Sequence, residues 1–164
     1  MLITPSGMDY SALVPGDLVF VDAGGNAHGS RKPSSEWRFH LDIYRQRPEA
    51  AAIVHVHAAG CTALASLRRS IPPFHYMVAL AGGNDIRCAE YATFGTQALS
   101  DSVLTALRGR KACLMANHGV LCFEATLPRA LDLALEIEHT RSVPFTRSWP
   151  GPACGGPSRG WSAA

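Results

Sequence analysis

Strand-like and helical spacings of apolar residues succeed one another along most of the chain. Short apolar runs at 17–22, 51–56 and 111–123 predict strands, and the turn Asn117-His118-Gly119 divides the last run in two. The segment 71–83, IPPFHYMVALAGG, has two prolines near its start and two glycines at its end, which predicts an extended connection.

Four other segments carry apolar residues at the spacing of an amphipathic helix. The first begins at a serine cap, Ser34 or Ser35, and ends at Pro48, and the others span 58–69, 96–108 and 126–140. Strands and helices are therefore mixed without strict alternation. This pattern indicates an α/β or α+β fold built of packed layers.

The character of the chain changes after residue 141. Proline, glycine and serine dominate residues 142–164, and no helical or strand-like periodicity remains there. We therefore expect a single domain over 1–141 and a disordered tail over 142–164.

Composition excludes several classes of protein. A net charge of +2 over 164 residues, without a dense block of lysine or arginine, argues against nucleic acid or an anionic membrane as the main partner. The sequence has no unbroken apolar segment of about 18 residues, the length that a transmembrane helix needs. The start, MLITPSGMDY, lacks the features of a signal peptide.

The five cysteines are odd in number and form no CxxC pair. This usage indicates free thiols in a reducing cytoplasm, with a secreted disulfide framework as the alternative.

Two histidines one residue apart are the first candidate for chemistry. His55 and His57 lie in the apolar run AIVHVH, and strand geometry points both side chains to the same face. Two imidazoles in this arrangement can bind one zinc ion, which needs a third protein ligand for catalysis. The remaining histidines are the candidates for that ligand: His28, His40, His75, His118 and His139.

His118 is distinguished among these because it lies in a tight turn directly after an apolar run, beside a glycine that permits close backbone approach. His40 and His139, on predicted helices, are interpreted as surface or packing residues, and His28 as a solvated residue in a polar turn. Simple packing and hydrogen bonding of His55 and His57 is the alternative to a metal site.

Several further motifs occur in a fixed order around these histidines: TPSG, KPSSEWRFH, IVHVHAAGCTA, RSIPPFHYM, AGGNDIRCAEYATFGT and ANHGVL. Taken together, from residue 2 to about 139, they resemble the class II aldolase/adducin family, and within it the aldolases that act on L-fuculose 1-phosphate. The resemblance implies a central, mainly antiparallel sheet flanked by helices. It also implies one Zn²⁺ per chain and a homotetramer with active sites between subunits.

The resemblance implies a role for each matching residue. It assigns the zinc to His55, His57 and His118, and it makes Glu36 the catalytic carboxylate, which can also approach the metal. The substrate phosphate is assigned to Ser6, Gly7, Ser34 and Ser35. Tyr76 is assigned to the aldehyde oxygen from across the subunit interface, and Phe94 to the lining of that region.

The reaction implied is cleavage of a ketose 1-phosphate to dihydroxyacetone phosphate and an aldehyde through a metal-stabilised enediolate. Zinc would act as the Lewis acid, and Glu36 would move a proton at the carbon that is released. Taken singly, each residue has a simpler interpretation. Glu36 could be a first-turn helix acid, Ser34 and Ser35 only caps, and Tyr76 and Phe94 core aromatics.

The chain departs from the family pattern at both ends. The family has further elements before ITPSG, including one that supplies an asparagine to the phosphate, and a longer helical tail after the region of Thr140. We therefore expect a truncated or frameshifted reading frame, or a mis-assigned start, with sheet edges and apolar surface left uncovered.

Related activities stay open as alternatives. These are a sugar-phosphate 4-epimerase, which typically has aspartate at the position of Glu36, a dehydratase, a decarboxylase, and an inactive fragment. An adducin-like scaffold is disfavoured, because such domains lose the metal histidines.

Overall fold

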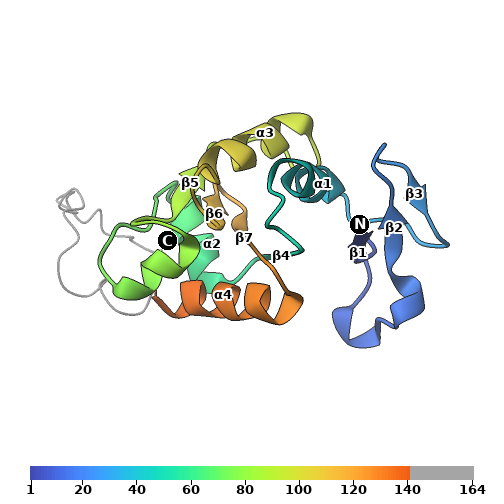
Figure 1. The fold of residues 1–164 in the computed structure, drawn as a ribbon, viewed down its shortest axis with the longest axis horizontal. Helices are drawn as coiled ribbons and strands as arrows, with labels where there is room; N and C mark the ends of the chain where they lie inside the picture. Colours follow the sequence, from blue (N-terminus) through green and yellow to red (C-terminus); the bar gives the residue numbers. More distant parts are fainter. Residues whose placement is uncertain (141–164) are drawn as a thin grey trace, which may run out of the picture.

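The computed structural model describes residues 1–140, which form two β-sheets with helices packed around the larger sheet (Figure 1). The expected tail over 142–164, and the domain boundary just before it, lie outside the described residues.

The larger sheet is mainly antiparallel, as expected. Its strand order is β4-β7-β6-β5, and only the pair β5–β6 is parallel. The strands are β4 (Ala52–Val56), β5 (Arg87–Ala89), β6 (Ala112–Met115) and β7 (Gly119–Glu124). The apolar run at 111–123 therefore forms a hairpin. Its turn covers residues 116–118, one residue earlier than predicted, because Gly119 already pairs with Met115.

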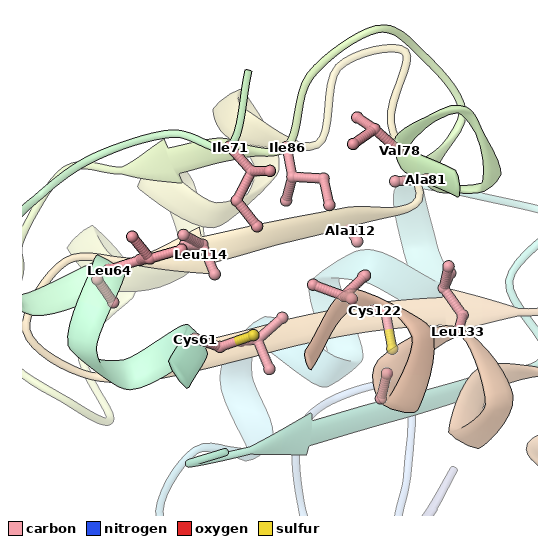
Figure 2. Close-up of a cluster of buried hydrophobic side chains, with 14 residues drawn as sticks. Cys61, Leu64, Ile71, Val78, Ala81, Ile86, Ala112, Leu114, Cys122 and Leu133 are labelled. Atoms are coloured by element: carbon pink, nitrogen blue, oxygen red, sulfur yellow. The ribbon is translucent and has the colours of Figure 1, made fainter. Parts of the chain in front are cut away.

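Helices cover both faces of this sheet. On one face, α2 (Ala59–Ser66), α4 (Leu127–Thr140) and the 3₁₀ helix η3 (Tyr76–Ala81) enclose a buried apolar cluster. Figure 2 shows Cys61 and Leu64 from α2 and Leu133 from α4 turned toward Leu114 and Cys122 of the sheet. On the other face, α1 (Trp37–Gln46) packs against α3 (Gln97–Ala106), and α3 contacts β5 and β6. A second buried cluster fills this side and includes Leu121 and Phe123 of β7.

The smaller sheet contains β1 (Leu2–Ile3), β2 (Val19–Val21) and β3 (Ala27–His28), paired antiparallel in that order. Short 3₁₀ helices, η1 (Tyr10–Ala12) and η2 (Pro15–Asp17), lie between β1 and β2. The strand predicted over 17–22 is therefore shorter than expected. The Asp17 side chain accepts a hydrogen bond from the backbone N–H of Val14, which holds Asp17 in the preceding turn.

The prediction of an extended connection over 71–83 is wrong in its second half. Ile71 forms a bridge with Ile86, but residues 76–81 turn into η3. The imidazole of His75 accepts a hydrogen bond from the backbone N–H of Met77, and this local cap starts the turn. Gly82, with φ of 91°, ends it in a conformation that favours glycine.

The helices predicted at 58–69, 96–108 and 126–140 are confirmed, with ends shifted by a few residues. The largest shift is in α2, which ends at Ser66, and Arg68 adopts a left-handed φ of 53° just beyond it. A left-handed residue cannot continue a right-handed helix, so the three-residue difference has a backbone cause.

A buried carboxylate joins α1 to α3. Asp42 is 9% exposed, and it accepts hydrogen bonds from Ser100 (2.7 Å), Gln97 (2.9 Å) and Arg45 (2.8 Å). Burial alone would raise the pKa of Asp42, but these donors favour the charged form more strongly, so its pKa lies below the ordinary value.

The Asp42 network predicts a pH-dependent contribution to stability. Because its pKa is lowered in the folded protein, the stabilisation is complete above the unfolded value near 4 and is lost as the pH falls. We expect Asp42→Ala to lower the free energy of unfolding by roughly 2–4 kcal/mol at pH 7, and by clearly less at pH 3.

Urea unfolding at both pH values measures this difference. Asp101→Ala is the control, because Asp101 is exposed and also accepts a hydrogen bond from Gln97. An equal loss of stability in Asp42→Ala at pH 3 and pH 7 would contradict the account.

Candidate metal centre

The pairing of β4 with β7 brings three histidines together. His55 lies in β4, and His57 follows the last residue of this strand directly. His118 lies in the turn just before β7, where Val120 pairs with Val56. Each pair of imidazole rings has its centroids 4.9 Å apart. The predicted HxH pair and its third partner therefore converge on one point.

The local backbone at the turn explains how His118 reaches this point. Asn117 adopts a left-handed φ of 57°, a conformation that asparagine tolerates better than most residues. Gly119 follows, and a Cβ atom there would lie 2.6 Å from the carbonyl oxygen of Val56 and 2.9 Å from the His57 ring. Only glycine allows the turn to approach β4 this closely.

Glu36 completes the cluster from the start of α1. Its Oε2 lies 3.0 Å from Nε2 of His55, and its Oε1 lies 3.1 Å from Nε2 of His118. One ligand atom from each of the four residues falls within 4.8 Å of the others. The Glu36 side chain is only 12% exposed, so this carboxylate is held inside the protein.

A hydrogen bond of His55 determines its tautomer, and therefore which group its ring directs toward Glu36. Its Nδ1 lies 2.9 Å from the carbonyl oxygen of Val120, which can only accept, so Nδ1 carries the proton. A neutral His55 then turns the lone pair of Nε2 toward a carboxylate oxygen. Among the described residues, neither Nε2 of His55 nor Oε1 of Glu36 has a hydrogen-bond partner.

The lone pair of Nε2 of His55 faces Oε2 of Glu36 at 3.0 Å, and two acceptors this close repel unless a cation lies between them. Three imidazoles and one carboxylate form a typical zinc donor set, and a backbone carbonyl that orients a ligand histidine is the usual outer-shell arrangement. The residues present therefore fit a divalent metal ion.

The charge states of the cluster favour metal binding. Burial alone would raise the pKa of Glu36, but His118 and His55 beside it outweigh this effect and hold its pKa well below the usual range. Burial lowers the pKa of His57, and the neighbouring His55 and His118 add to the shift. Glu36 is thus ionised and His57 neutral at pH 7, as ligands must be.

Two cavities adjoin the cluster. The larger, of about 790 Å³, includes Ser34, Glu36, His55 and His57 in its wall. The smaller, of about 330 Å³, is lined by Ser35, Glu36, His57, Tyr91, Ala92, Phe94, Asn117 and His118. The structure therefore places Ser34, Ser35 and Phe94 beside the cluster.

Ser6 and Gly7 lie on a segment that pairs with the segment of Ser34. The backbone N–H of Ser6 donates to Lys32 (3.0 Å), and that of Ser34 donates to Thr4 (3.0 Å). The two segments assigned to the phosphate are thus held side by side. Neither Ser6 nor Gly7 is in the wall of the two cavities described above.

Tyr76 is not brought to the cluster within this chain. It lies on η3, is 79% exposed, and lines neither cavity. The interpretation of Tyr76 and Phe94 as core aromatics is wrong, since Phe94 is also 64% exposed.

The other histidines stay out of the cluster. His28 is exposed as expected, but it lies in β3 rather than in a turn and pairs with Asp22 at 3.0 Å. His75 caps η3, and His139 is exposed on α4. His40 packs against Phe39, and burial lowers its pKa to about 3, so it is neutral at pH 7.

The expected serine cap at the start of α1 is only partly present. The helix begins at Trp37 with Glu36 in the N-cap position, and Ser34 accepts a 3.3 Å hydrogen bond from the backbone N–H of Glu36. The Glu36 side chain makes no capping hydrogen bond, because it turns toward the histidines instead. Its interpretation as a simple helix acid is therefore wrong.

Two residues that shape the site, Tyr91 and Gly95, were not predicted from the sequence. Tyr91 lines the smaller cavity and lies under the guanidinium of Arg68 at 5.9 Å. Gly95, with φ of 73°, lets its loop approach Ser35, because a Cβ there would lie 2.9 Å from the Ser35 carbonyl oxygen. The glycine of the motif ATFGT was the available signal for this contact.

A ligand substitution tests the cluster as a metal site. We expect His57→Ala to weaken zinc binding by more than about 100-fold, because even outer-shell changes cost roughly 10–100-fold in metal affinity. Competition with a fluorescent zinc chelator measures this loss. His139→Ala is the control, and equal zinc affinity in the two variants would show that the ligand set is wrong.

The close approach at Gly119 is tested separately. We expect Gly119→Ala to lower the free energy of unfolding by roughly 1–3 kcal/mol, because the added methyl group must displace the β4 backbone. Zinc affinity should fall as well. Gly16→Ala is the control, since a Cβ at Gly16 meets nothing within 4 Å. Thermal melts that are identical for the two variants would contradict this prediction.

No helix within residues 1–140 is long and apolar enough to cross a membrane. In this part of the chain, Cys88, Cys113 and Cys122 carry free thiols.

Known proteins resemble this chain in both sequence and structure. The 5-methylthioribulose-1-phosphate/5-deoxyribulose-1-phosphate aldolase of Rhodospirillum rubrum is 57% identical over 139 residues, which cover 85% of this chain and 63% of that protein. The L-fuculose phosphate aldolase of Escherichia coli K12 is 53% identical over 138 residues, which cover 84% of this chain and 64% of that protein. The chain thus spans less than two thirds of the length of these relatives.

A solved structure of an L-fuculose 1-phosphate aldolase superposes with a TM-score of 0.83 and 44% identity, covering 86% of this chain and 66% of that one. Residues 1–143 match the family model of the class II aldolase and adducin N-terminal domain. The cluster of three histidines and a glutamate therefore lies in a chain that belongs to the class II aldolase and adducin N-terminal domain family.

Proposed function

We propose that residues 1–141 form the catalytic domain of a zinc-dependent aldolase. Its reaction would be the cleavage of a ketose 1-phosphate, of the L-fuculose 1-phosphate type, to dihydroxyacetone phosphate and an aldehyde. The observation that carries the proposal is the pair of unpartnered buried acceptors, Nε2 of His55 and Oε1 of Glu36, among three converging imidazoles. The names of the relatives support the substrate class.

His55, His57 and His118 would hold the metal. Three imidazoles favour zinc over the harder divalent ions, which prefer oxygen ligands. When bound, the metal supplies a Lewis acid for the negative charge that develops on the substrate during carbon–carbon cleavage.

Glu36 would act as the proton carrier. The neighbouring histidines keep it ionised, so it is ready to accept a proton. In the synthetic direction it removes a proton from the carbon next to the carbonyl group of dihydroxyacetone phosphate. In the cleavage direction it returns that proton to the same carbon.

Ser6 and Gly7, with Ser34 and Ser35, would bind the substrate phosphate. The two segments lie side by side through backbone hydrogen bonds. Ser34 and Ser35 immediately precede α1, where the N-terminal end of the helix favours an anion. Hydroxyl and backbone N–H groups suit phosphate oxygens, and Ser34 and Ser35 lie in the walls of the cavities beside Glu36.

Tyr76 would exchange a proton with the aldehyde oxygen from a neighbouring subunit, with Phe94 lining the same region. This role requires an assembly, which we propose to be a homotetramer. The exposure of both aromatic rings, 79% and 64%, supports an interface at these positions. Free thiols in the described residues support a cytoplasmic location.

Substitution of the proton carrier tests the reaction. We expect Glu36→Gln to retain zinc through the three histidines but to reduce cleavage of L-fuculose 1-phosphate by roughly 10²–10⁴-fold. Dihydroxyacetone phosphate release and zinc content are measured on the same samples. His139→Ala serves as the unaffected control.

Unchanged turnover in Glu36→Gln would show that Glu36 is not the proton carrier. Formation of an epimeric sugar phosphate by the unmodified chain, without dihydroxyacetone phosphate, would favour the epimerase alternative. Absence of any product, with zinc bound, would favour an inactive fragment.

A further inference from the structure

One ligand of the cluster, His57, lies just beyond the sheet. β4 ends at Val56, which forms the last residue pair with β7, and His57 follows it. His57 is exposed, whereas the side chains of His55 and Glu36 are only 10% and 12% exposed. Strand pairing therefore holds His55 in place, but the position of His57 also depends on the segment that comes after it.

That segment is the start of α2. A single residue, Ala58, separates His57 from the helix and serves as its N-cap. The methyl side chain of Ala58 cannot accept a hydrogen bond from the first N–H groups of the helix, which have no acceptor within the helix itself. With eight residues, α2 is also too short to be stable alone. The start of α2 therefore depends on a cap from another part of the chain.

Glu138 of α4 provides this cap. Its Oε1 accepts a 2.9 Å hydrogen bond from the backbone N–H of Gly60, and its Oε2 accepts one of 2.9 Å from that of Cys61. Gly60 and Cys61 are both buried, so loss of the carboxylate would take these acceptors away from two buried donors, which is costly. The negative charge adds to the interaction, because it lies at the positive end of the helix dipole.

The other end of α2 is tied to a second segment that carries a ligand. The carbonyl oxygen of Ala65 accepts a 2.9 Å hydrogen bond from the backbone N–H of Asn117, which directly precedes His118. The helix α2 thus connects the segment of His57 to the turn of His118. Since the hairpin holds this far end, loss of the Glu138 cap would release the end of α2 that follows His57.

We infer that Glu138 is a positioning residue for the metal site. Its carboxylate fixes the first turn of α2, and this turn keeps the His57 ring beside those of His55 and His118, with centroids 4.9 Å apart. The inference rests on the proposed function, because it requires the cluster to bind zinc. It makes the metal affinity of the chain depend on α4, a helix outside the four residues of the cluster.

Zinc affinity tests this role without any measurement of activity. We expect Glu138→Ala to weaken zinc binding by about 10–100-fold, the usual effect of a change just outside the ligand set. Glu138→Gln keeps a carbonyl acceptor for one of the two N–H groups, so its loss should lie between those of Glu138→Ala and the unmodified chain. It also provides a result where Glu138→Ala folds poorly. Competition with a fluorescent zinc chelator measures all three proteins.

Two controls separate positioning from a general loss of stability. Glu136→Gln changes a carboxylate of the same helix that is two residues away and therefore on a different side. Val103→Ala removes core contacts in α3, where Val103 is 0% exposed, and should lower the free energy of unfolding. Both variants should bind zinc within about twofold of the unmodified chain, since neither acts on α2.

A double substitution shows whether Glu138 acts through His57. Once the His57 imidazole is removed, its position no longer affects the metal. Adding Glu138→Ala to His57→Ala should therefore change the remaining zinc affinity by less than about twofold. A role of Glu138 in overall stability alone would not produce this dependence on His57.

Three outcomes would overturn the inference. The first is zinc affinity in Glu138→Ala within about twofold of the unmodified chain, whatever its stability. The second is an equal loss of zinc affinity in Val103→Ala. The third is an equal effect of Glu138→Ala with and without His57. Absence of zinc binding by the unmodified chain would overturn the proposed function as well. Normal zinc binding that responds to Glu138→Ala, without any release of dihydroxyacetone phosphate, would contradict only the proposed function.

Discussion

The register between β4 and β7 is the constraint on which the metal centre depends. Five residue pairs, from Ala52 with Glu124 to Val56 with Val120, fix this register. A slip of one residue would turn His55, and His57 just beyond the strand, to the opposite face of the sheet. The register is secured by packing, because Val54 and Val56 contact the core formed with α2 and α4, whereas Ile53 contacts the core formed with α1 and α3.

The same register sets the electrostatics of the site. It places the carbonyl oxygen of Val120 beside Nδ1 of His55, which fixes the tautomer and directs a lone pair toward Glu36. It also brings the turn with His118 against β4, through the close approach at Gly119. The ligand positions therefore follow from backbone pairing rather than from flexible side chains, which reduces the entropy lost when a metal binds.

The sequence predicted the parts of the site that depend on local spacing. The HxH pair, the turn at His118 and the mainly antiparallel sheet followed from periodicity, motif and resemblance, and the structure agrees with each. The 3₁₀ helix η3 was not predicted. The prolines and glycines of residues 71–83 favour an extended segment, but a hydrogen bond to the His75 side chain starts a helical turn there. The exposed position of Tyr76 could not be predicted from periodicity, and only the resemblance, which assigns this residue to a subunit interface, implied it. The larger cavity beside the cluster has residues of both β1 and β4 in its wall, so it depends on the placement of two sheets, which no local pattern encodes.

The central claim is that three histidines of this chain bind one zinc ion beside Glu36. X-ray absorption at the zinc edge of the purified, zinc-loaded chain tests it most directly, because it reports the ligand atoms and their distances. The account predicts nitrogen and oxygen ligands at about 2.0–2.2 Å, with the outer scattering of imidazole rings and no sulfur at about 2.3 Å. A sulfur ligand, or zinc surrounded only by water oxygens, would contradict it.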